Sequence, residues 1–124
     1  MILIIGGAYQ GKLDYAKAAF SLTPEDIFTC AGAEIDFSKR CVNALEEFCY
    51  ACVQQELDPV DYFRSHEGAW QDSILICNDL SSGVVPMDAA DRQWRHSTGR
   101  LCQYLARQAN QVSRIFCGLE QRLK

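Results

Sequence analysis

The segment that most constrains this chain lies near its start, where a short apolar run leads into a glycine-rich turn. Residues 2–5 read Ile-Leu-Ile-Ile, and residues 6–13 read Gly-Gly-Ala-Tyr-Gln-Gly-Lys-Leu. The turn fits the pattern G-x-x-x-x-G-K-[ST] except at its last position, where Leu13 replaces the hydroxyl residue. In that pattern, backbone N–H groups cradle nucleotide phosphates, the lysine reaches the outer phosphates and the hydroxyl binds Mg²⁺. A phosphate-binding strand–loop–helix unit is therefore predicted.

Six residues of this turn are candidate nucleotide contacts. Backbone N–H groups at a helix N-terminus favour an anion, and Lys12 adds a positive charge that makes it a candidate catalytic residue as well. Leu13 removes one Mg²⁺ ligand, which costs more in turnover than in binding, because phosphoryl transfer depends on charge neutralisation by metal and cations. We therefore expect phosphate binding without efficient chemistry, and no firm Mg²⁺ site. The predicted binding residues are Gly6, Gly7, Ala8, Gly11, Lys12 and Leu13.

A carboxylate elsewhere in the chain could hold the metal. Asp79 closely follows the apolar run 73–77, so it is the best-placed candidate, both as a metal ligand and as a catalytic residue. The same carboxylate could instead cap a turn with Ser81 or Ser82, and the sequence leaves these two roles open. Asp36 is a weaker candidate, because it lies further from the strand that precedes it.

Length, charge and hydropathy narrow the class of protein. A chain of 124 residues is expected to form one domain, residues 1–124. The formal net charge of −4 argues against broad nucleic-acid binding, which needs a basic face. No apolar run approaches the roughly 20 residues of a membrane span. The N-terminal apolar stretch has no basic flank before it, so it indicates a strand rather than a signal peptide, and a cytoplasmic location is predicted.

Seven cysteines are an odd count, which argues against a disulfide framework in a chain without an export signal. Cys49 and Cys52 stand three residues apart on a predicted helix that also carries Cys41. They could form a metal or redox pair, but no second cysteine pair at zinc-ligand spacing supports one, so a helical core face is favoured. Three further cysteines fall in or beside apolar strand-like runs and are expected to be small buried hydrophobes: Cys30, Cys77 and Cys117.

The periodicity of the apolar residues predicts alternating strands and helices. Strands are expected at residues 2–5, 27–30, 73–77 and 115–117. Helices are expected at residues 13–22, 37–57, 60–66 and 89–111, the last one capped by Asp88. This alternation predicts a parallel α/β sheet with helices on both faces. The loop after the first strand then lies at the carboxyl edge of the sheet, where such sheets bind ligands.

Motifs at both ends of the chain resemble one family. Residues 78–86, Asn-Asp-Leu-Ser-Ser-Gly-Val-Val-Pro, resemble an Asn-Glu-Val-Gly-x-Gly-Ile-Val-Pro loop, and residues 91–100 resemble Ala-Arg-x-Phe-Arg-Asp-x-x-Gly-x. Residues 118–124 resemble a closing Gly-Leu-Pro-x-x-Leu-Lys, and residues 4–12 are similar to Thr-Gly-Gly-Ala-Arg-Ser-Gly-Lys-Ser. These four motifs are those of the bifunctional adenosylcobinamide kinase / adenosylcobinamide-phosphate guanylyltransferase family of cobalamin biosynthesis.

This resemblance implies a three-layer P-loop nucleotide-binding fold with a mainly parallel sheet. It implies ATP or GTP as the nucleotide, and a kinase that phosphorylates the side chain of adenosylcobinamide. The family then transfers GMP onto that phosphate through a guanylylated histidine. Its members are oligomers with the active site near subunit contacts, so a homo-oligomer is expected here.

The chain also departs from the family pattern. Leu13 replaces the loop hydroxyl, and residues 31–72 show no match to the family's histidine stretch or to its Asp-Cys-Leu-Thr-Leu metal-binding strand. His66, at a predicted helix end, is not assigned the guanylyl role, and His96 is expected to be solvated. We interpret the chain as a shortened, degenerate member that binds nucleotide with impaired or lost catalysis. The alternatives are an active small kinase whose Mg²⁺ is held by Asp79 or water, and a non-catalytic partner or regulatory homologue.

Overall fold

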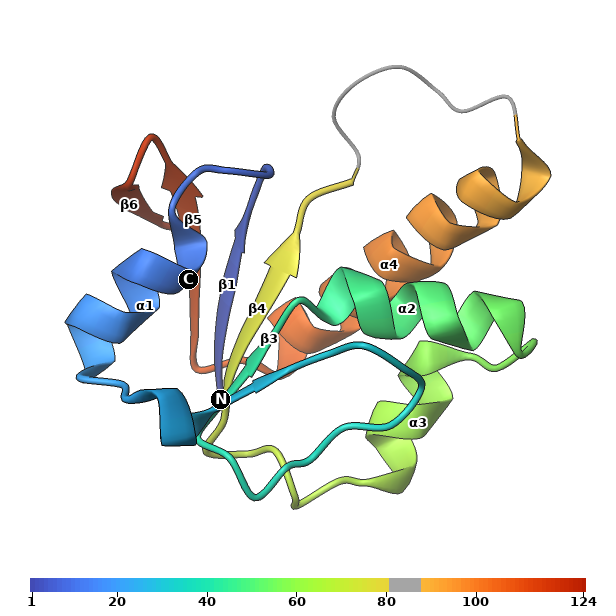
Figure 1. The fold of residues 1–124 in the computed structure, drawn as a ribbon, viewed down its shortest axis with the longest axis horizontal. Coiled ribbons are helices and arrows are strands. Elements are labelled where there is room, and N and C mark those ends of the chain that lie inside the picture. The colour runs from blue at the N-terminus through green and yellow to red at the C-terminus, as the bar shows by residue number, and fades with distance from the viewer. Residues whose placement is uncertain (81–87) are drawn as a thin grey trace.

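A computed structural model describes residues 1–80 and 88–124, and within these ranges six strands form one sheet (Figure 1). The strands are β1 (Ile2–Gly6), β2 (Ile27–Thr29), β3 (Cys41–Asn43), β4 (Ile74–Asn78), β5 (Gln111–Phe116) and β6 (Leu119–Arg122). The helices are α1 (Lys12–Phe20), α2 (Leu45–Gln54), α3 (Pro59–Ser65) and α4 (Ala89–Gln108), with a short 3₁₀ turn at Pro24–Asp26.

The sheet is parallel except at one edge, which confirms the predicted mainly parallel α/β fold. Its strand order is β2-β3-β4-β1-β5-β6, and β1 lies between β4 and β5. Ile2 of β1 is in register with Ile74 of β4 and with Gln111 of β5. β6 pairs antiparallel with β5 and forms the exception. The phosphate-loop strand is therefore central, and its carboxyl end meets the ends of β3 and β4 at one edge.

Helices cover both faces of the sheet, so the three-layer prediction is confirmed (Figure 1). Successive residues of a strand point to opposite faces. Leu3 packs in the cluster with α2, α3 and α4, whereas the next residue, Ile4, packs in the cluster with α1. Leu75 and Ile76 of β4 divide in the same way. Burial on both faces explains why β1 and β4 are continuous apolar runs rather than alternating ones.

The predicted helix 37–57 is wrong in its first part. Residues 41–43 form strand β3, and α2 begins only at Leu45. Ala44 separates them in a left-handed conformation with φ 62°, which no continuous helix permits. Cys41 packs toward α1 and Val42 packs toward α2, so successive side chains point to opposite faces, as in a strand. The helical spacing of the apolar residues in this segment hid that alternation in the sequence. Asp36 lies in a turn before β3, where its Oδ1 accepts a hydrogen bond from the Ser38 N–H.

The C-terminal part also differs from the prediction. Asp88 caps α4 as expected, with its Oδ1 accepting from the Ala90 N–H at 2.7 Å, but the helix ends at Gln108. The last parallel strand is longer than predicted, and β6 was not predicted at all. Cys117 was expected in a buried strand but lies exposed in the turn between β5 and β6. The predicted turn of Ser81 or Ser82 with Asp79 falls outside the described residues.

The cysteine pair on α2 belongs to the core, as favoured from the sequence. Cys49 and Cys52 are fully buried, and burial raises the pKa of the Cys52 thiol to about 11. Across residues 1–80 and 88–124, no group of three or more His, Cys, Asp or Glu side chains is arranged to hold a metal ion. In the same described part of the chain, no helix combines the length and apolar character that crossing a bilayer requires.

The close packing of β1 against β5 generates a first prediction. A Cβ on Gly6 would lie 2.5 Å from the Ile115 carbonyl oxygen, a contact that only a backbone shift relieves. Gly6→Ala should therefore lower the free energy of unfolding by about 2 to 3 kcal/mol in chemical denaturation. Gly7→Ala is the matched control, because its Cβ would meet only Gln10 Cγ at 3.7 Å. Equal stability of the two variants would contradict the packing described here.

Candidate functional site

The glycine-rich turn connects β1 to α1 as a compact loop. Gly11 adopts φ 87° as the N-cap of α1, a conformation that favours glycine. The Tyr15 N–H donates to the Gly11 carbonyl at 2.9 Å, so the helical hydrogen bonds begin at that point. The N–H groups of the first turn, including those of Lys12 and Leu13, have no partner within the helix and are directed to the loop side. This end of α1 is suited to an anion.

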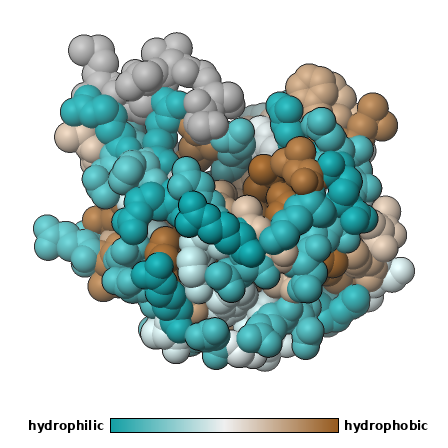
Figure 2. Space-filling model, turned by 180° about the vertical axis from the view of Figure 1, so that it is seen from behind, coloured by the Kyte–Doolittle hydropathy of each residue, from teal (hydrophilic) through white to brown (hydrophobic). Residues whose placement is uncertain are grey.

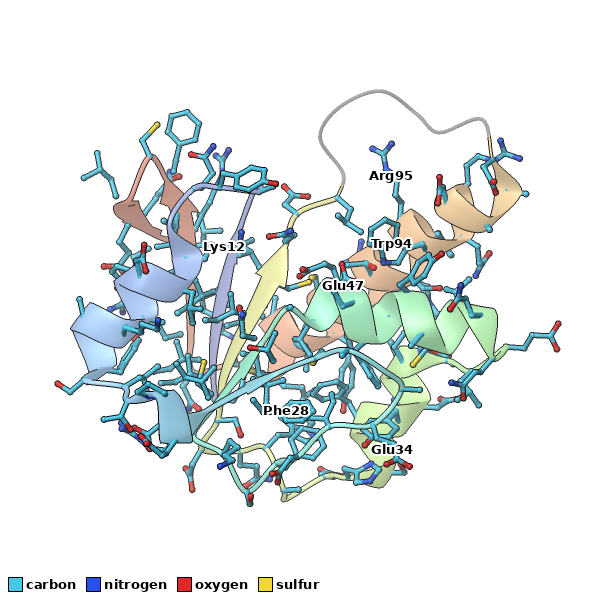
Figure 3. All side chains as sticks on the ribbon, viewed as in Figure 1. Lys12, Phe28, Glu34, Glu47, Trp94 and Arg95 are labelled. Atoms are coloured by element: carbon cyan, nitrogen blue, oxygen red, sulfur yellow. The ribbon has the colours of Figure 1, made fainter. Side chains whose placement is uncertain are left out.

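Lys12 lies beneath this loop and is only 9% exposed (Figure 3). Its Nζ donates to the Gly7 carbonyl at 2.7 Å, so the ammonium group is held within the turn. Burial lowers the pKa of Lys12, while the negative charge of the Glu46 carboxylate opposes that shift. An anion bound in the loop would oppose it further, because a nearby negative charge favours the ammonium form.

Gln10 ties the loop to the β5–β6 hairpin. Its carbonyl accepts from the Gly118 N–H at 2.8 Å, and its side-chain Oε1 accepts from the Cys117 N–H at 2.7 Å. Cys117 and Gly118 have φ 51° and 76°, the left-handed pair typical of a two-residue hairpin turn. The hairpin thus braces the loop from the side opposite β4. Figure 2 shows apolar surface at its tip, where Leu119 is 72% exposed.

A cavity of about 440 Å³ opens between the loop and the carboxyl ends of β3 and β4. It brings together the lysine of the loop, the amide side chains that end the two strands, and a carboxylate from the first turn of α2. The residues that line it are Tyr9, Gly11, Lys12, Leu13, Asp14, Asn43, Ala44, Glu46 and Asn78.

Glu46 is a buried carboxylate of this cavity that sequence reasoning missed. It is 7% exposed, and its Oε1 accepts from the Asn78 N–H at 2.9 Å. The Trp94 indole N–H donates to its backbone carbonyl at 2.7 Å, which fixes the start of α2 against α4. A carboxylate in this place could be found only once β3 and the turn at Ala44 are known, because the predicted long helix put it in mid-helix.

Of the other candidate binding residues, the loop glycines and Lys12 come together as expected from the motif. Leu13 is half-buried and packs against the apolar cluster under α1, so the position of the missing hydroxyl contributes to the core. Ala8 is exposed and lines a neighbouring cavity of about 350 Å³ with Gly7 and Asp79. The roles of these residues in binding remain predictions.

Asp79 lies next to the loop but faces a different cavity from Lys12. Its N–H donates to the Gly6 carbonyl at 2.7 Å, immediately after β4. It lines the cavity of about 350 Å³ and another of about 240 Å³, both bordered by Arg95 of α4. The cavity around Lys12 includes Asn78 but not Asp79. Its role as a metal ligand or catalytic residue therefore remains a prediction.

The two histidines lie away from the loop. His66 follows α3 as its C-cap, as predicted, and stacks on Tyr62 at a centroid distance of 4.2 Å. His96 is exposed on α4. Neither histidine lines the cavity around Lys12.

The fold and the glycine-rich loop together define the class of protein. A parallel sheet whose central strand leads through a Gly-rich, lysine-bearing loop into a helix is a P-loop-type α/β fold. The sequence pattern of the cobinamide kinase / cobinamide phosphate guanyltransferase family matches residues 42–123, so the chain belongs to this family and is a cobalamin-biosynthesis, kinase-like protein. A search of curated proteins found no match.

The matched range begins in β3 and ends just after β6, so it includes residues 42–72, for which motif comparison found no counterpart. The glycine-rich loop lies outside it. Strand β3, in the middle part of the chain, ends at the Lys12 cavity, and its last residue is Asn43. An amide side chain therefore stands at this strand end.

The link between Gln10 and the hairpin generates a second prediction. Gln10→Ala leaves the Cys117 N–H without its protein acceptor and should lower the free energy of unfolding by about 1 kcal/mol. Gln10→Glu keeps an acceptor oxygen at the same place and should stay closer to the wild type. Thermal denaturation of both variants measures the difference. An equal loss in both variants would show that the side-chain hydrogen bond does not brace the loop.

Proposed function

We propose that this chain binds the phosphates of ATP or GTP at Gly6–Leu13, and that its phosphoryl and guanylyl transfer are impaired or lost. One observation carries the binding part: the buried Lys12 ammonium lies inside a glycine-rich turn at the N-terminus of α1. A buried ammonium is costly unless an anion compensates it. A nucleotide polyphosphate supplies that anion, and the helix N-terminus supplies unpaired N–H donors for it.

The loss of catalysis is proposed from the metal ligands. Phosphoryl transfer depends on positioning and on charge neutralisation by Mg²⁺ and cations. Two positions beside the loop lack a hydroxyl or a charged oxygen ligand, because Leu13 is apolar and half-buried and β3 ends on the neutral amide of Asn43. The loop therefore offers no hydroxyl to Mg²⁺, and β3 offers it no carboxylate. Guanylyl transfer also needs a histidine, and His66 and His96 lie outside the cavity.

A second candidate function is an active small kinase that phosphorylates adenosylcobinamide. The backbone link between Asp79 and the Gly6 carbonyl favours it, because it places a carboxylate beside the loop. A third is a non-catalytic partner or regulatory homologue within cobalamin biosynthesis. In each case we propose a cytoplasmic homo-oligomer, following the family resemblance, and the exposed edge strand β6 offers one surface for self-association.

Nucleotide titration tests the binding proposal. The wild-type chain should bind ATP or GTP by calorimetry at micromolar to millimolar concentrations. Lys12→Met should weaken binding about 10- to 100-fold, the effect of losing one charge-assisted hydrogen bond to phosphate. Lys17→Met is the matched control, because Lys17 is an exposed lysine on the same helix. If neither nucleotide binds the wild type at millimolar concentration, the proposal fails.

Turnover separates the candidate functions. Incubation of the chain with a nucleotide, Mg²⁺ and cobinamide should yield no cobinamide phosphate under the impaired-catalysis proposal. Phosphorylated product at enzymatic rates would instead establish the active kinase.

The missing hydroxyl makes a further prediction about Mg²⁺. Leu13→Ser restores the ligand that the motif supplies, so Mg²⁺ should increase nucleotide affinity at least about threefold more in this variant than in the wild type. Leu13→Ala is the control, because it removes the same apolar side chain without adding a hydroxyl. Calorimetric titrations with Mg²⁺ and with EDTA measure the two responses. An identical metal response in both variants would mean that a hydroxyl at residue 13 does not reach the metal of a bound nucleotide.

A further inference from the structure

Glu46 is a buried carboxylate that the proposed phosphate site does not use. Its side chain is 7% exposed and lines the same cavity as Lys12. One oxygen, Oε1, accepts from the Asn78 N–H at 2.9 Å. Across the described residues, Oε2 has no hydrogen-bond partner and no cation lies within ion-pair distance of the carboxylate. A carboxylate so deeply buried is costly without a compensating positive charge.

Lys12 does not provide that charge directly. Its Nζ donates to the Gly7 carbonyl at 2.7 Å, and it interacts with Glu46 across the cavity without forming an ion pair. A nucleotide phosphate bound near Lys12 would then face the negative charge of Glu46. Two like charges that face each other across a cavity repel, and a cation between them relieves the repulsion. The cavity is therefore better suited to an anion that brings a cation than to an anion alone.

The donor atoms around this position are the kind that Mg²⁺ prefers. Mg²⁺ is usually bound by one or two carboxylates together with substrate phosphates and waters. Asn43 lines the same cavity, and its Nδ2 donates to Thr29 Oγ1 at 3.4 Å, which leaves the amide oxygen Oδ1 as a ligand. Glu46 belongs to α2 and Asn43 belongs to β3, so neither residue comes from the loop that lacks its hydroxyl.

We propose that Glu46, assisted by Asn43 Oδ1, holds the divalent cation of a bound nucleotide in place of the loop hydroxyl that Leu13 lacks. This inference rests on the proposed phosphate site. Across residues 1–80 and 88–124, no cluster of three acidic, cysteine or histidine side chains is arranged for a metal. The cation is therefore held only jointly with phosphate, and Mg²⁺ alone should not bind measurably.

The test compares Glu46→Gln with Glu47→Gln in the full chain. Gln keeps an acceptor for the Asn78 N–H, so the variant removes charge and little else. Glu47 is the matched control, since it is the next residue in the first turn of α2 and is exposed (Figure 3). Calorimetry with ATP and with GTP, each in EDTA and in Mg²⁺, gives four affinities for each protein.

The proposal predicts different changes of nucleotide affinity in Mg²⁺ and in EDTA. In the wild type and in Glu47→Gln, Mg²⁺ should increase nucleotide affinity about tenfold. In Glu46→Gln this gain should fall below about twofold, while the affinity in EDTA stays equal or rises, because the repulsion between carboxylate and phosphate is gone. A merely structural role for Glu46 would weaken binding in EDTA and in Mg²⁺ alike.

The outcomes separate the two proposals. No nucleotide binding by the wild type would overturn the phosphate site itself. Nucleotide binding with an undiminished Mg²⁺ gain in Glu46→Gln, or with no Mg²⁺ gain in the wild type, would overturn the role of Glu46 and leave the phosphate site standing. Mn²⁺ with ATP provides a readout that needs no variant: paramagnetic broadening of amide NMR signals should be strongest around Asn43 and Glu46. Broadening centred on Asp79 instead would overturn the inference.

Discussion

The site depends on how tightly the glycine-rich turn is held between β1, α1 and the β5–β6 hairpin. Gly6 lies so close to the Ile115 carbonyl that no side chain fits between them. Gln10 then fastens the turn to the hairpin through its carbonyl and its side chain. Because β1 is central in a parallel sheet, this fixed turn faces the carboxyl ends of β3 and β4. The cavity around Lys12 follows from that arrangement.

The charged side chains in this cavity link the loop to the rest of the site. Burial disfavours the ammonium form of Lys12, and Glu46 partly restores it from across the cavity. A phosphate would satisfy Lys12 but oppose Glu46, so we propose that the two charges favour a nucleotide that brings a cation with it. Leu13 removes one ordinary ligand of that cation and Asn43 offers a neutral amide oxygen, while Glu46 supplies a carboxylate from α2. We therefore propose that the chain keeps the phosphate part of its family's site and alters the metal part.

Local patterns in the sequence were sufficient for about half of the fold. The apolar runs of β1 and β4, the helix after the loop and the Asp88 cap are each specified within a few residues, and each was predicted. β3 could not be predicted, because its three residues form a strand only by pairing with β2 and β4. β6 likewise depends on the hairpin turn at Cys117 and Gly118. Both missed elements bear on the site.

The candidate site was likewise predicted only in part. The motif fixes the loop residues, since glycine and lysine spacing is a local property. Glu46 was missed, because it reaches the cavity only through the left-handed turn at Ala44 that ends β3. Asp79 was placed correctly after β4, but the sequence could not show that its neighbour Asn78 faces the Lys12 cavity instead.

The central claim is that nucleotide phosphates bind on the N–H groups of the loop, and backbone NMR tests it most directly. Titration of ¹⁵N-labelled protein with GTP or ATP should shift the amide signals of Gly7–Leu13 most strongly. Smaller changes should follow at Asn43, Glu46 and Asn78. If the largest shifts instead fall around the cavity between α2 and α4 that Val53 and Arg100 line, or if no amide shifts at millimolar nucleotide, the account is contradicted.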